Sequence, residues 1–414
     1  MPGFLSLAVY ICRMLAGVIN LYKSAYTGLS KETWYLSLVM FINRSGTMVL
    51  PFMTIYCTQQ LKFSIIQAGF IMAIFGAGSI AGAFLGGKIT DKAGFYYLQV
   101  GALLSGGLMF LTISFLDTFL TLAIGTFILS MCNESFRPAN STAIAHYSKE
   151  NVRTRSYSLN RLAINLGWSF GGAIGGFLAS IDYHLLFYVD GFTNISAAFI
   201  LLKLLPPVSK KKPVLIAEDK AIIKSAYQDK EYLIFIILTT LFASCFFQLF
   251  TMQPVFFKTQ WNFSEQFIGL LMALNGILIV ITEMVLINNL EGKKPTLFFI
   301  TVGVVLVGIG YSLFNVLPAA AWVAVLSVVI ITLGEMLSMP FMNTYWIART
   351  NENNRGEYAA LYTISWSGAQ ILAPIYGAVL IQQGGYSSLW WFLTVVCILC
   401  ALGYYSIHKR HLHM

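Results

Sequence analysis

The run TLFFITVGVVLVGIGYSLFN, residues 296–315, decides the fold class, because it is apolar on every side of the helix that it would form. The hydrocarbon layer of a membrane is about 30 Å thick, and about 20 consecutive apolar residues span it as an α-helix. A membrane β-barrel would instead show segments of about ten residues in which apolar and polar positions alternate. The run therefore predicts a transmembrane helix.

Similar apolar runs continue along the chain on both sides of this one and give twelve predicted spans. We place them at 34–58, 66–87, 96–116, 119–146, 157–180, 184–205, 232–257, 265–289, 296–315, 319–347, 358–382 and 386–407. The composition agrees, since 57% of the 414 residues are hydrophobic and 10% are charged, whereas soluble domains are about 45–50% apolar and about 25% charged. The prediction is an all-α membrane protein embedded in a lipid bilayer, and a soluble enzyme is excluded.

Basic residues are divided unevenly between the two sides of the predicted membrane. Of the 26 Lys and Arg residues, 21 lie in alternate loops and in the termini on one side, Lys62 and Lys258 lie on the other, and the remaining three lie inside predicted spans. Positively charged loops stay in the cytoplasm, so we expect both termini there, in a multi-pass protein of the plasma or inner membrane. The basic residues do not alternate with aromatic ones on one face, so nucleic acid is not an expected partner despite the net charge of +9.

The termini and the middle of the chain fall outside the twelve spans. Residues 4–22 are apolar but interrupted by Arg13 and lack a cleavage site, so we predict an interfacial helix rather than a signal peptide or a further span. A stretch with three consecutive lysines separates six spans from six. The predicted organisation is an N-terminal segment 1–32, a six-helix bundle 33–205, a cytoplasmic linker 206–230, a second six-helix bundle 231–407 and a cytoplasmic tail 408–414.

The two halves show traces of an internal repeat. Shifting the chain by 202 residues places Pro138 on Pro340 and Gly175 on Gly377. Two six-helix repeats are common in secondary transporters, where the substrate site lies near the membrane midplane between them.

The loop after the second predicted span carries the most specific motif of the chain. Its sequence GKITDKAG, residues 87–94, is similar to the G-x-x-x-D-[RK]-x-G motif of the major facilitator superfamily, and the chain resembles that family from 34 to 407. Phe95 and Tyr96 depart from it, because they stand where members carry a basic pair. The resemblance implies two bundles related by a pseudo-two-fold axis and a cytoplasmic latch in which Asp91 accepts hydrogen bonds at a helix N-terminus of the other half. The predicted gating residues are Gly87, Asp91, Lys92, Gly94 and Arg355.

The fifth predicted span contains a second motif, GWSFGGAIGG at residues 167–176. It is similar to the G-x-x-x-G-P-x-x-G-G motif of drug:proton antiporters in the same superfamily, although Gly172 replaces the proline. Glycines at this spacing also form a flat face that lets another helix approach closely, and both interpretations stay open. The predicted packing residues are Gly167, Gly171, Gly172, Gly175 and Gly176, with Pro374 at the matching place of the second half.

Three carboxylates within the apolar runs are candidates for proton coupling, because ionisable groups inside a membrane are costly and usually functional. They are Glu335, Glu283 and Glu134, of which we favour Glu335. A carboxylate in apolar surroundings can bind and release a proton near neutral pH. Such a group would link the proton gradient to alternating access if a cation approached it in one conformation only.

The expected charge partners of these carboxylates are three arginines. Arg137 follows Glu134 by three residues on one helix face and can pair with it. Arg44 or Arg137 would approach Glu335 in one conformation. Arg161 lies near the end of its span, where we expect it to extend toward water.

Polar and aromatic residues in the middle of the spans are candidates for lining a substrate cavity. The predicted lining residues are Asn43, Asn133, Asn165, Trp168, Gln248, Asn275, Asn343, Tyr362 and Trp366.

The first functional interpretation is a proton-driven antiporter that exports drugs or other small amphipathic molecules. The alternative is uptake of di- and tripeptides with protons, since GEMLSMP at residues 334–340 is similar to the tenth-helix motif of peptide symporters. Arg44 stands where the E-x-x-E-R motif of those symporters ends, but both acidic residues are missing. A receptor or scaffold is a further alternative. We find no catalytic motif, P-loop or metal cluster, so we expect no enzyme activity, no cofactor and a monomer.

Overall fold

The structure, a computed structural model, describes residues 28–149, 153–208, 225–290, 292–350 and 355–412. The predicted interfacial helix before residue 28, the middle of the linker and the last two residues of the tail lie outside the described residues. Within the described ranges the chain is almost entirely helical and contains no strand.

The first half forms six helical segments in chain order. The first segment is made of α2 (Lys31–Ser45), α3 (Val49–Ile55) and the π-helix η1 (Tyr56–Gln60), and it is followed by α4 (Ile65–Ala93), α5 (Phe95–Ile113), α6 (Phe119–Tyr147), α7 (Arg153–Ala179) and α8 (His184–Leu204). Ser64 begins α4 with a reciprocal capping box to Gln67. Gly94, with φ of 90°, separates α4 from α5, because this backbone conformation favours glycine.

The second half repeats this plan. A short 3-10 turn, η3 (Ala226–Gln228), leads into a broken first segment of α9 (Lys230–Phe246), α10 (Gln248–Thr251) and α11 (Gln253–Thr259), followed by α12 (Glu265–Leu290), α13 (Thr296–Val316), α14 (Ala321–Ala348) and α15 (Arg355–Leu412). Gly385, with φ of 73°, divides α15 into two helices. Eleven segments in the described ranges are long and apolar enough to cross a membrane, and the last of them, Glu357–Lys409, holds two spans. The twelve predicted spans are therefore present.

Backbone details support the internal repeat better than the residue matches do. Lys62 and Asn262 follow the first segment of each half, and both adopt the left-handed conformation, with φ of 58° and 53°. In each half the next N–H bonds back to a carbonyl six residues earlier, Phe63 to Cys57 and Phe263 to Phe257, both at 2.9 Å. The same turn therefore connects the first two spans of each half.

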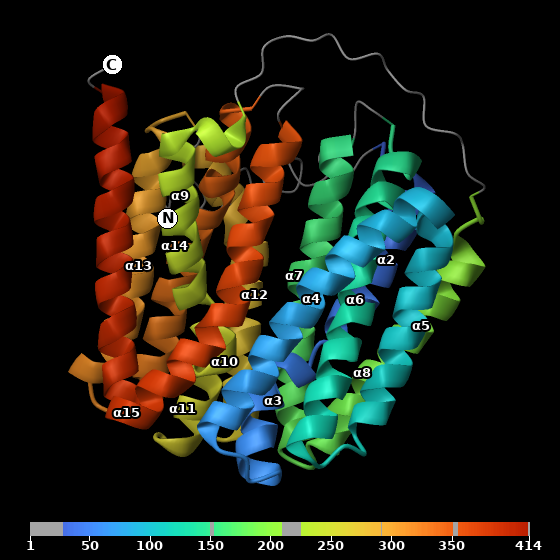
Figure 1. The fold of residues 1–414 in the computed structure, drawn as a ribbon, viewed down its shortest axis with the longest axis horizontal. Coiled ribbons are helices and arrows are strands. Elements are labelled where there is room, and N and C mark those ends of the chain that lie inside the picture. Colours follow the sequence, from blue (N-terminus) through green and yellow to red (C-terminus); the bar gives the residue numbers. More distant parts are fainter. Residues whose placement is uncertain (1–27, 150–152, 209–224, 291, 351–354, 413–414) are drawn as a thin grey trace, which may run out of the picture.

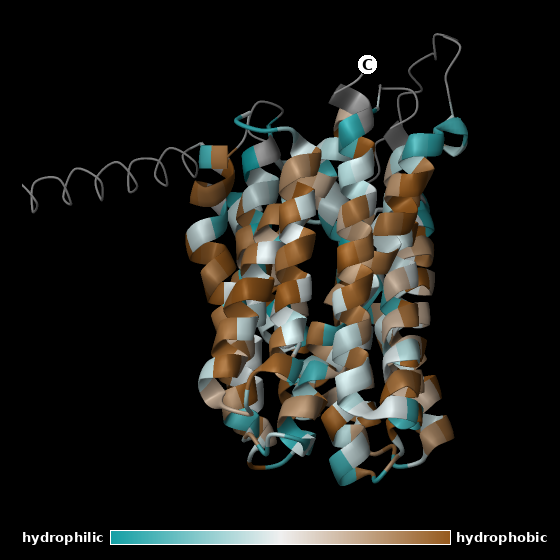
Figure 2. Cartoon of the chain, turned by 90° about the vertical axis from the view of Figure 1, so that its left-hand side faces the viewer, coloured by the Kyte–Doolittle hydropathy of each residue, from teal (hydrophilic) through white to brown (hydrophobic). Residues whose placement is uncertain are grey.

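The two halves form two bundles that lie side by side (Figure 1). Between the bundles α4 packs against α15 and α7 packs against α12. Hydrophobic residues cover the lengths of the helices, whereas hydrophilic residues gather at the two ends (Figure 2). We call the end where α8 stops and α9 starts the linker end, which is at the top of Figure 1, and the opposite end the far end.

Candidate functional site

The first span is broken beside a cavity between the two halves of the chain. Between α2 and α3, residues Gly46, Thr47 and Met48 leave the helix. A Cβ at Gly46 would lie 2.9 Å from the Cβ of Thr193 on α8, so α2 and α8 approach closely at this point. A helix start exposes unpaired N–H groups, which need acceptors when they are buried.

Asp190 of α8 supplies those acceptors. Its side-chain oxygens accept hydrogen bonds from the N–H of Met48 at 3.0 Å and of Val49 at 2.9 Å. Asp190 is fully buried. One turn before the break, Asn43 donates to the side-chain oxygen of Asn194 at 2.8 Å, and Asn194 donates to the backbone oxygen of Asp190. Both sides of the break are therefore fixed to α8, and Asn43 belongs to this network rather than to the cavity wall.

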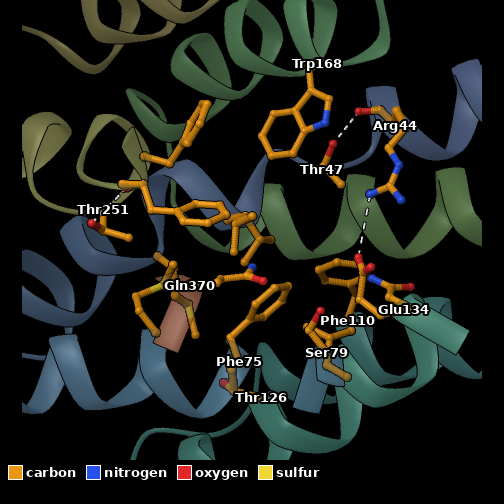
Figure 3. Close-up of a pocket in the computed structure, with 18 of the residues that line it drawn as sticks. Arg44, Thr47, Phe75, Ser79, Phe110, Thr126, Glu134, Trp168, Thr251 and Gln370 are labelled. Carbon is orange, nitrogen blue, oxygen red and sulfur yellow. Dashed lines mark hydrogen bonds and ion pairs between the residues drawn. The ribbon is translucent and has the colours of Figure 1, made fainter. Parts of the chain in front are cut away.

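The cavity has a volume of about 270 Å³ and receives residues from both halves (Figure 3). Most of its wall comes from the first bundle, and Phe247 between α9 and α10, α10 itself and α15 complete it. The ring of Trp168 lies 5.6 Å from that of Phe250, which joins the two halves at the wall. The lining residues are Arg44, Thr47, Val49, Leu50, Met53, Met72, Phe75, Ser79, Phe110, Thr126, Leu129, Asn133, Glu134, Arg137, Ile164, Trp168, Phe247, Phe250, Thr251 and Gln370.

One end of this cavity carries three charged side chains. Glu134 accepts a hydrogen bond from Arg137 at 3.2 Å, and its other oxygen lies 3.9 Å from Nη1 of Arg44. The side chain of Arg44 is 13% exposed and that of Glu134 is 11% exposed, whereas Arg137 is 67% exposed. Nε of Arg44 and Oδ1 of Asn133 are buried without a hydrogen-bond partner in the described chain. We name Arg44, Glu134 and Arg137 the charged triad.

Arg161 joins the two bundles instead of only extending toward water. It forms an ion pair with Glu283 of α12, because α7 packs directly against that helix. The side chain of Arg161 is half exposed and that of Glu283 is nearly buried. Arg161, one of the three expected charge partners, therefore pairs with one of the three candidate carboxylates, and this partner comes from the other half of the chain.

Glu335 lies in the second bundle, close to that ion pair. It accepts a hydrogen bond from Asn275 at 3.0 Å, and Asn275 also donates to Thr332 at 2.9 Å. Among the described residues no lysine or arginine forms an ion pair with Glu335. Arg44 and Arg137, its expected partners, are held by Glu134 in this conformation.

Most of the other predicted cavity residues have different partners. Asn133 and Trp168 line the cavity, whereas Asn165 is absent from its wall. Gln248 is buried and donates to the backbone oxygen of Ala373, so it ties α10 to α15. Asn275 supports Glu335, Asn343 is exposed beside Trp346, and Tyr362 and Trp366 pack in an aromatic group behind Phe247. These polar and aromatic residues lie within spans, as predicted, but their contacts with other helices determine which of them line the cavity.

The glycines of α7 lie on two faces of that helix. Gly167, Gly171 and Gly175 face the first span, and a Cβ at Gly167 would lie 2.6 Å from the Cβ of Arg44. Gly172 and Gly176 face α12 of the other bundle. On the opposite interface, the backbone oxygen of Pro374 would lie 2.8 Å from a Cβ at Gly69. Small residues therefore allow close contact at both interfaces between the bundles.

The predicted latch can be followed only in part. Gly87 is half-buried, Lys92 is exposed and Gly94 ends α4 at the linker end. The side chains of Asp91 and Arg355 lie outside the described part of the chain, so the gating role of these residues stays a prediction.

At the far end a polar cluster that sequence reasoning missed joins the bundles. Glu265 of α12 accepts a hydrogen bond from Tyr183 at 2.6 Å and pairs with Lys258 at 2.7 Å. Gln266 donates to Ser180 at 3.0 Å. These residues come from short loops and helix ends of both halves, so local patterns do not reveal them.

Asp190 was also missed, although the sequence contains the signal. It interrupts the apolar run of α8, as the three predicted carboxylates interrupt theirs. A search for every acidic residue inside a predicted span would have found it.

Comparisons with known proteins agree on one family. Residues 36–374 match the family model described as Major Facilitator Superfamily. An uncharacterized MFS-type transporter of Bacillus subtilis, YqjV, is 24% identical over 85% of this chain and 87% of its own length. A Na⁺, Li⁺, K⁺/H⁺ antiporter of Planococcus maritimus is 24% identical over 81% of this chain and 86% of its own.

Solved structures show the same fold. A POT family transporter crystallised with a thioalcohol-conjugated peptide superimposes with a TM-score of 0.75. The match covers 91% of this chain and 96% of that one, at 16% sequence identity.

Proposed function

Because the chain belongs to the major facilitator superfamily, we propose that it is a proton-coupled secondary transporter that moves small amphipathic organic solutes by alternating access and exports them in exchange for protons. The observation that carries this proposal is the cavity, which both bundles line and which combines the charged triad with an aromatic wall. A site shared by two bundles changes its access when the bundles rock against each other. Cytoplasmic positions of the linker end and of both termini are part of the proposal.

Three ionisable groups at the interface between the bundles favour coupling to protons. Arg161 pairs with Glu283 across the interface, and Glu335 is close enough to interact electrostatically with both. One cation and two carboxyl groups are electrically neutral only when one carboxyl group carries a proton. In surroundings of low dielectric the neutral state is favoured, so this cluster takes up one proton.

Rocking of the bundles would then move the proton. Arg161 and Glu283 lie on α7 and α12, so relative movement of these helices separates them. When this movement brings a cation closer to Glu335, the ionised form of Glu335 is favoured, and a path to water on one side lets its proton leave. When the cation returns to Glu283, Glu335 takes up a proton again. We assign Glu335 as the carrier because Asn275 holds it in place and no cation neutralises it among the described residues.

Exchange of the solute for protons is supported by the relative from Planococcus maritimus, which is a Na⁺, Li⁺, K⁺/H⁺ antiporter. The peptide transporter similarity, at 16% identity, concerns the fold alone.

Proteoliposomes with an imposed pH gradient test this function. A panel of labelled amphipathic solutes, with di- and tripeptides for comparison, should include solutes whose flux responds to the gradient and runs against the proton flow. Glu335→Gln should abolish gradient-driven flux but retain solute exchange, because glutamine keeps the hydrogen bond and cannot ionise. Asp117→Asn, an exposed loop carboxylate, is the matched control and should transport normally. If solute flux through the unmodified protein does not change with the pH gradient, the proposed coupling to protons is wrong.

A further inference from the structure

The charged triad leaves one positive charge in the cavity wall without compensation. Of the residues that line the cavity, Arg44, Arg137 and Glu134 carry charge, and the others are neutral. Arginine keeps its charge in proteins, and one carboxyl group supplies at most one negative charge, so the wall keeps a net positive charge. A further cation in this space would be repelled, because charges interact strongly in surroundings of low dielectric.

The guanidinium group of Arg44 also lacks hydrogen-bond acceptors. Its distance of 3.9 Å to Glu134 is too long for a hydrogen bond, and its buried Nε has no partner in the described chain. A buried guanidinium without acceptors is costly, and a carboxylate is its best partner because two parallel N–H donors match two oxygens. Figure 3 shows the guanidinium of Arg44 at the end of the cavity where it points toward Glu134.

The backbone on both sides of Arg44 is held firmly. Asn43, the preceding residue, bonds to Asn194, and the break that follows is fixed by Asp190. The neighbouring α7 contacts the Cβ of Arg44 through Gly167. A donor that is fixed before the ligand arrives gains affinity, because little conformational freedom is lost on binding.

The rest of the wall fits an apolar body of limited size. Phe75, Phe110, Trp168, Phe247 and Phe250 provide aromatic surface, and the volume of about 270 Å³ is at the small end for ligand pockets. From these observations we infer that the cavity binds organic anions, in which one carboxylate-like group reaches Arg44 and an apolar body of aromatic size contacts the wall. This inference rests on the proposed function, in which the cavity is the solute-binding site, and it specifies that the solute is negatively charged.

Three probes of the same shape and different charge test the inference. Naphthylacetate, naphthylacetamide and naphthylethylamine carry a negative, no and a positive charge at neutral pH, and their binding to the purified protein in detergent is measured by isothermal titration calorimetry. We expect the acetate to bind at least about tenfold more tightly than the amide, since a charge-assisted hydrogen bond exceeds a neutral one. The amine should bind most weakly.

Variants of the triad locate the effect. Arg44→Gln should weaken naphthylacetate about tenfold or more and leave naphthylacetamide unchanged. Arg44→Lys should lie between the two, because it keeps the charge and loses the planar pair of donors. Lys203→Gln, an exposed basic residue of α8, is the matched control and should bind all three probes like the unmodified protein.

Specific results would overturn the inference. One is that the amide or the amine binds as tightly as the acetate or more tightly. Another is that no probe binds at millimolar concentration. A third is that a folded Arg44→Gln variant binds the acetate as tightly as the unmodified protein does. If Arg44→Gln does not fold, the ranking of the three probes on the unmodified protein decides alone. Binding in detergent needs no proton gradient, so failure here is separate from failure of gradient-driven flux in proteoliposomes.

Discussion

The carboxylate of Asp190 accepts the backbone N–H of Val49 at 2.9 Å, across the contact between α8 and the first span. The same carboxylate also accepts the N–H of Met48. These donors belong to the start of α3, where no preceding turn of helix supplies an acceptor. A fully buried acid of the sixth segment therefore fixes the position at which the first segment is broken.

Asp190→Ala should destabilise the protein strongly. The change leaves two buried N–H groups without acceptors, and each costs about 1–3 kcal/mol. Asp190→Asn should cost less, because the amide oxygen still accepts one of the two bonds. Thermal unfolding in detergent measures both, with Asp117→Ala in an exposed loop as the control. Unfolding of Asp190→Ala at the temperature of the unmodified protein would contradict this role.

The ion pair between Arg161 and Glu283 should show thermodynamic coupling. Arg161→Gln removes the cation that neutralises a nearly buried carboxylate, whereas the double variant with Glu283→Gln also removes the unpaired charge. The double variant should therefore be at least as stable as the single one. Because Arg161 is half exposed, we expect a coupling energy of about 1 kcal/mol.

A double-mutant cycle by thermal or chemical unfolding in detergent measures this coupling. The pair Arg161→Gln and Asp117→Asn serves as a control, because Asp117 is exposed and forms no ion pair among the described residues. Additive effects of Arg161→Gln and Glu283→Gln would show that the two side chains do not interact.

The fold could be predicted from the sequence because each span carries its own signal. Apolar runs of sufficient length, loop lysines and one charged linker identify twelve helices without knowledge of their neighbours. The pair Glu134 and Arg137 could be predicted for the same reason, since three residues on one helix bring them together.

The rest of the site could not be predicted, because its contacts join helices that are far apart in the chain. Arg161 and Glu283 meet only because α7 packs on α12, and Asn275 reaches Glu335 from another helix. The sequence shows that Arg44 places a charge inside a span, which is energetically costly. It does not show that Glu134, rather than Glu335, is the neighbour of Arg44. Helix packing decides which of several possible charge pairs forms.

The pH dependence of stability should include a contribution from Asp229, outside the spans at the linker end. Burial opposes its ionised form, but hydrogen bonds from the N–H of Tyr232 and from Arg349 and Tyr358 outweigh burial and hold the pKa of Asp229 below its usual value. A carboxyl group with a lowered pKa in the folded state stabilises the protein above its unfolded pKa, about 4, and loses this effect as the pH falls through the folded value.

Asp229→Asn should therefore be less stable than the unmodified protein at neutral pH. The difference should stay constant down to about pH 4 and narrow below it, since both proteins are then uncharged at this position. Thermal unfolding in detergent over a series of pH values measures the difference, and Asp117→Asn is the control in an exposed loop. A difference that widens toward low pH would contradict the assignment.

Gly176 should be essential for the contact between the two bundles. A Cβ at this position would lie 2.9 Å from the Cα of Gly269 on α12, and backbone cannot move aside as a flexible side chain does. Gly176→Ala should therefore force α7 away from α12, with a loss of about 1–3 kcal/mol of stability. Transport should fall as well, because the same helices carry Arg161 and Glu283. Gly101→Ala on α5 is the matched control, since a Cβ there meets no atom within 4 Å. Helix propensity favours alanine over glycine by about 1 kcal/mol at both positions. If Gly101→Ala is stabilised and Gly176→Ala is destabilised, the loss of stability comes from the interface. If both variants are stabilised, the bundles do not need this close approach.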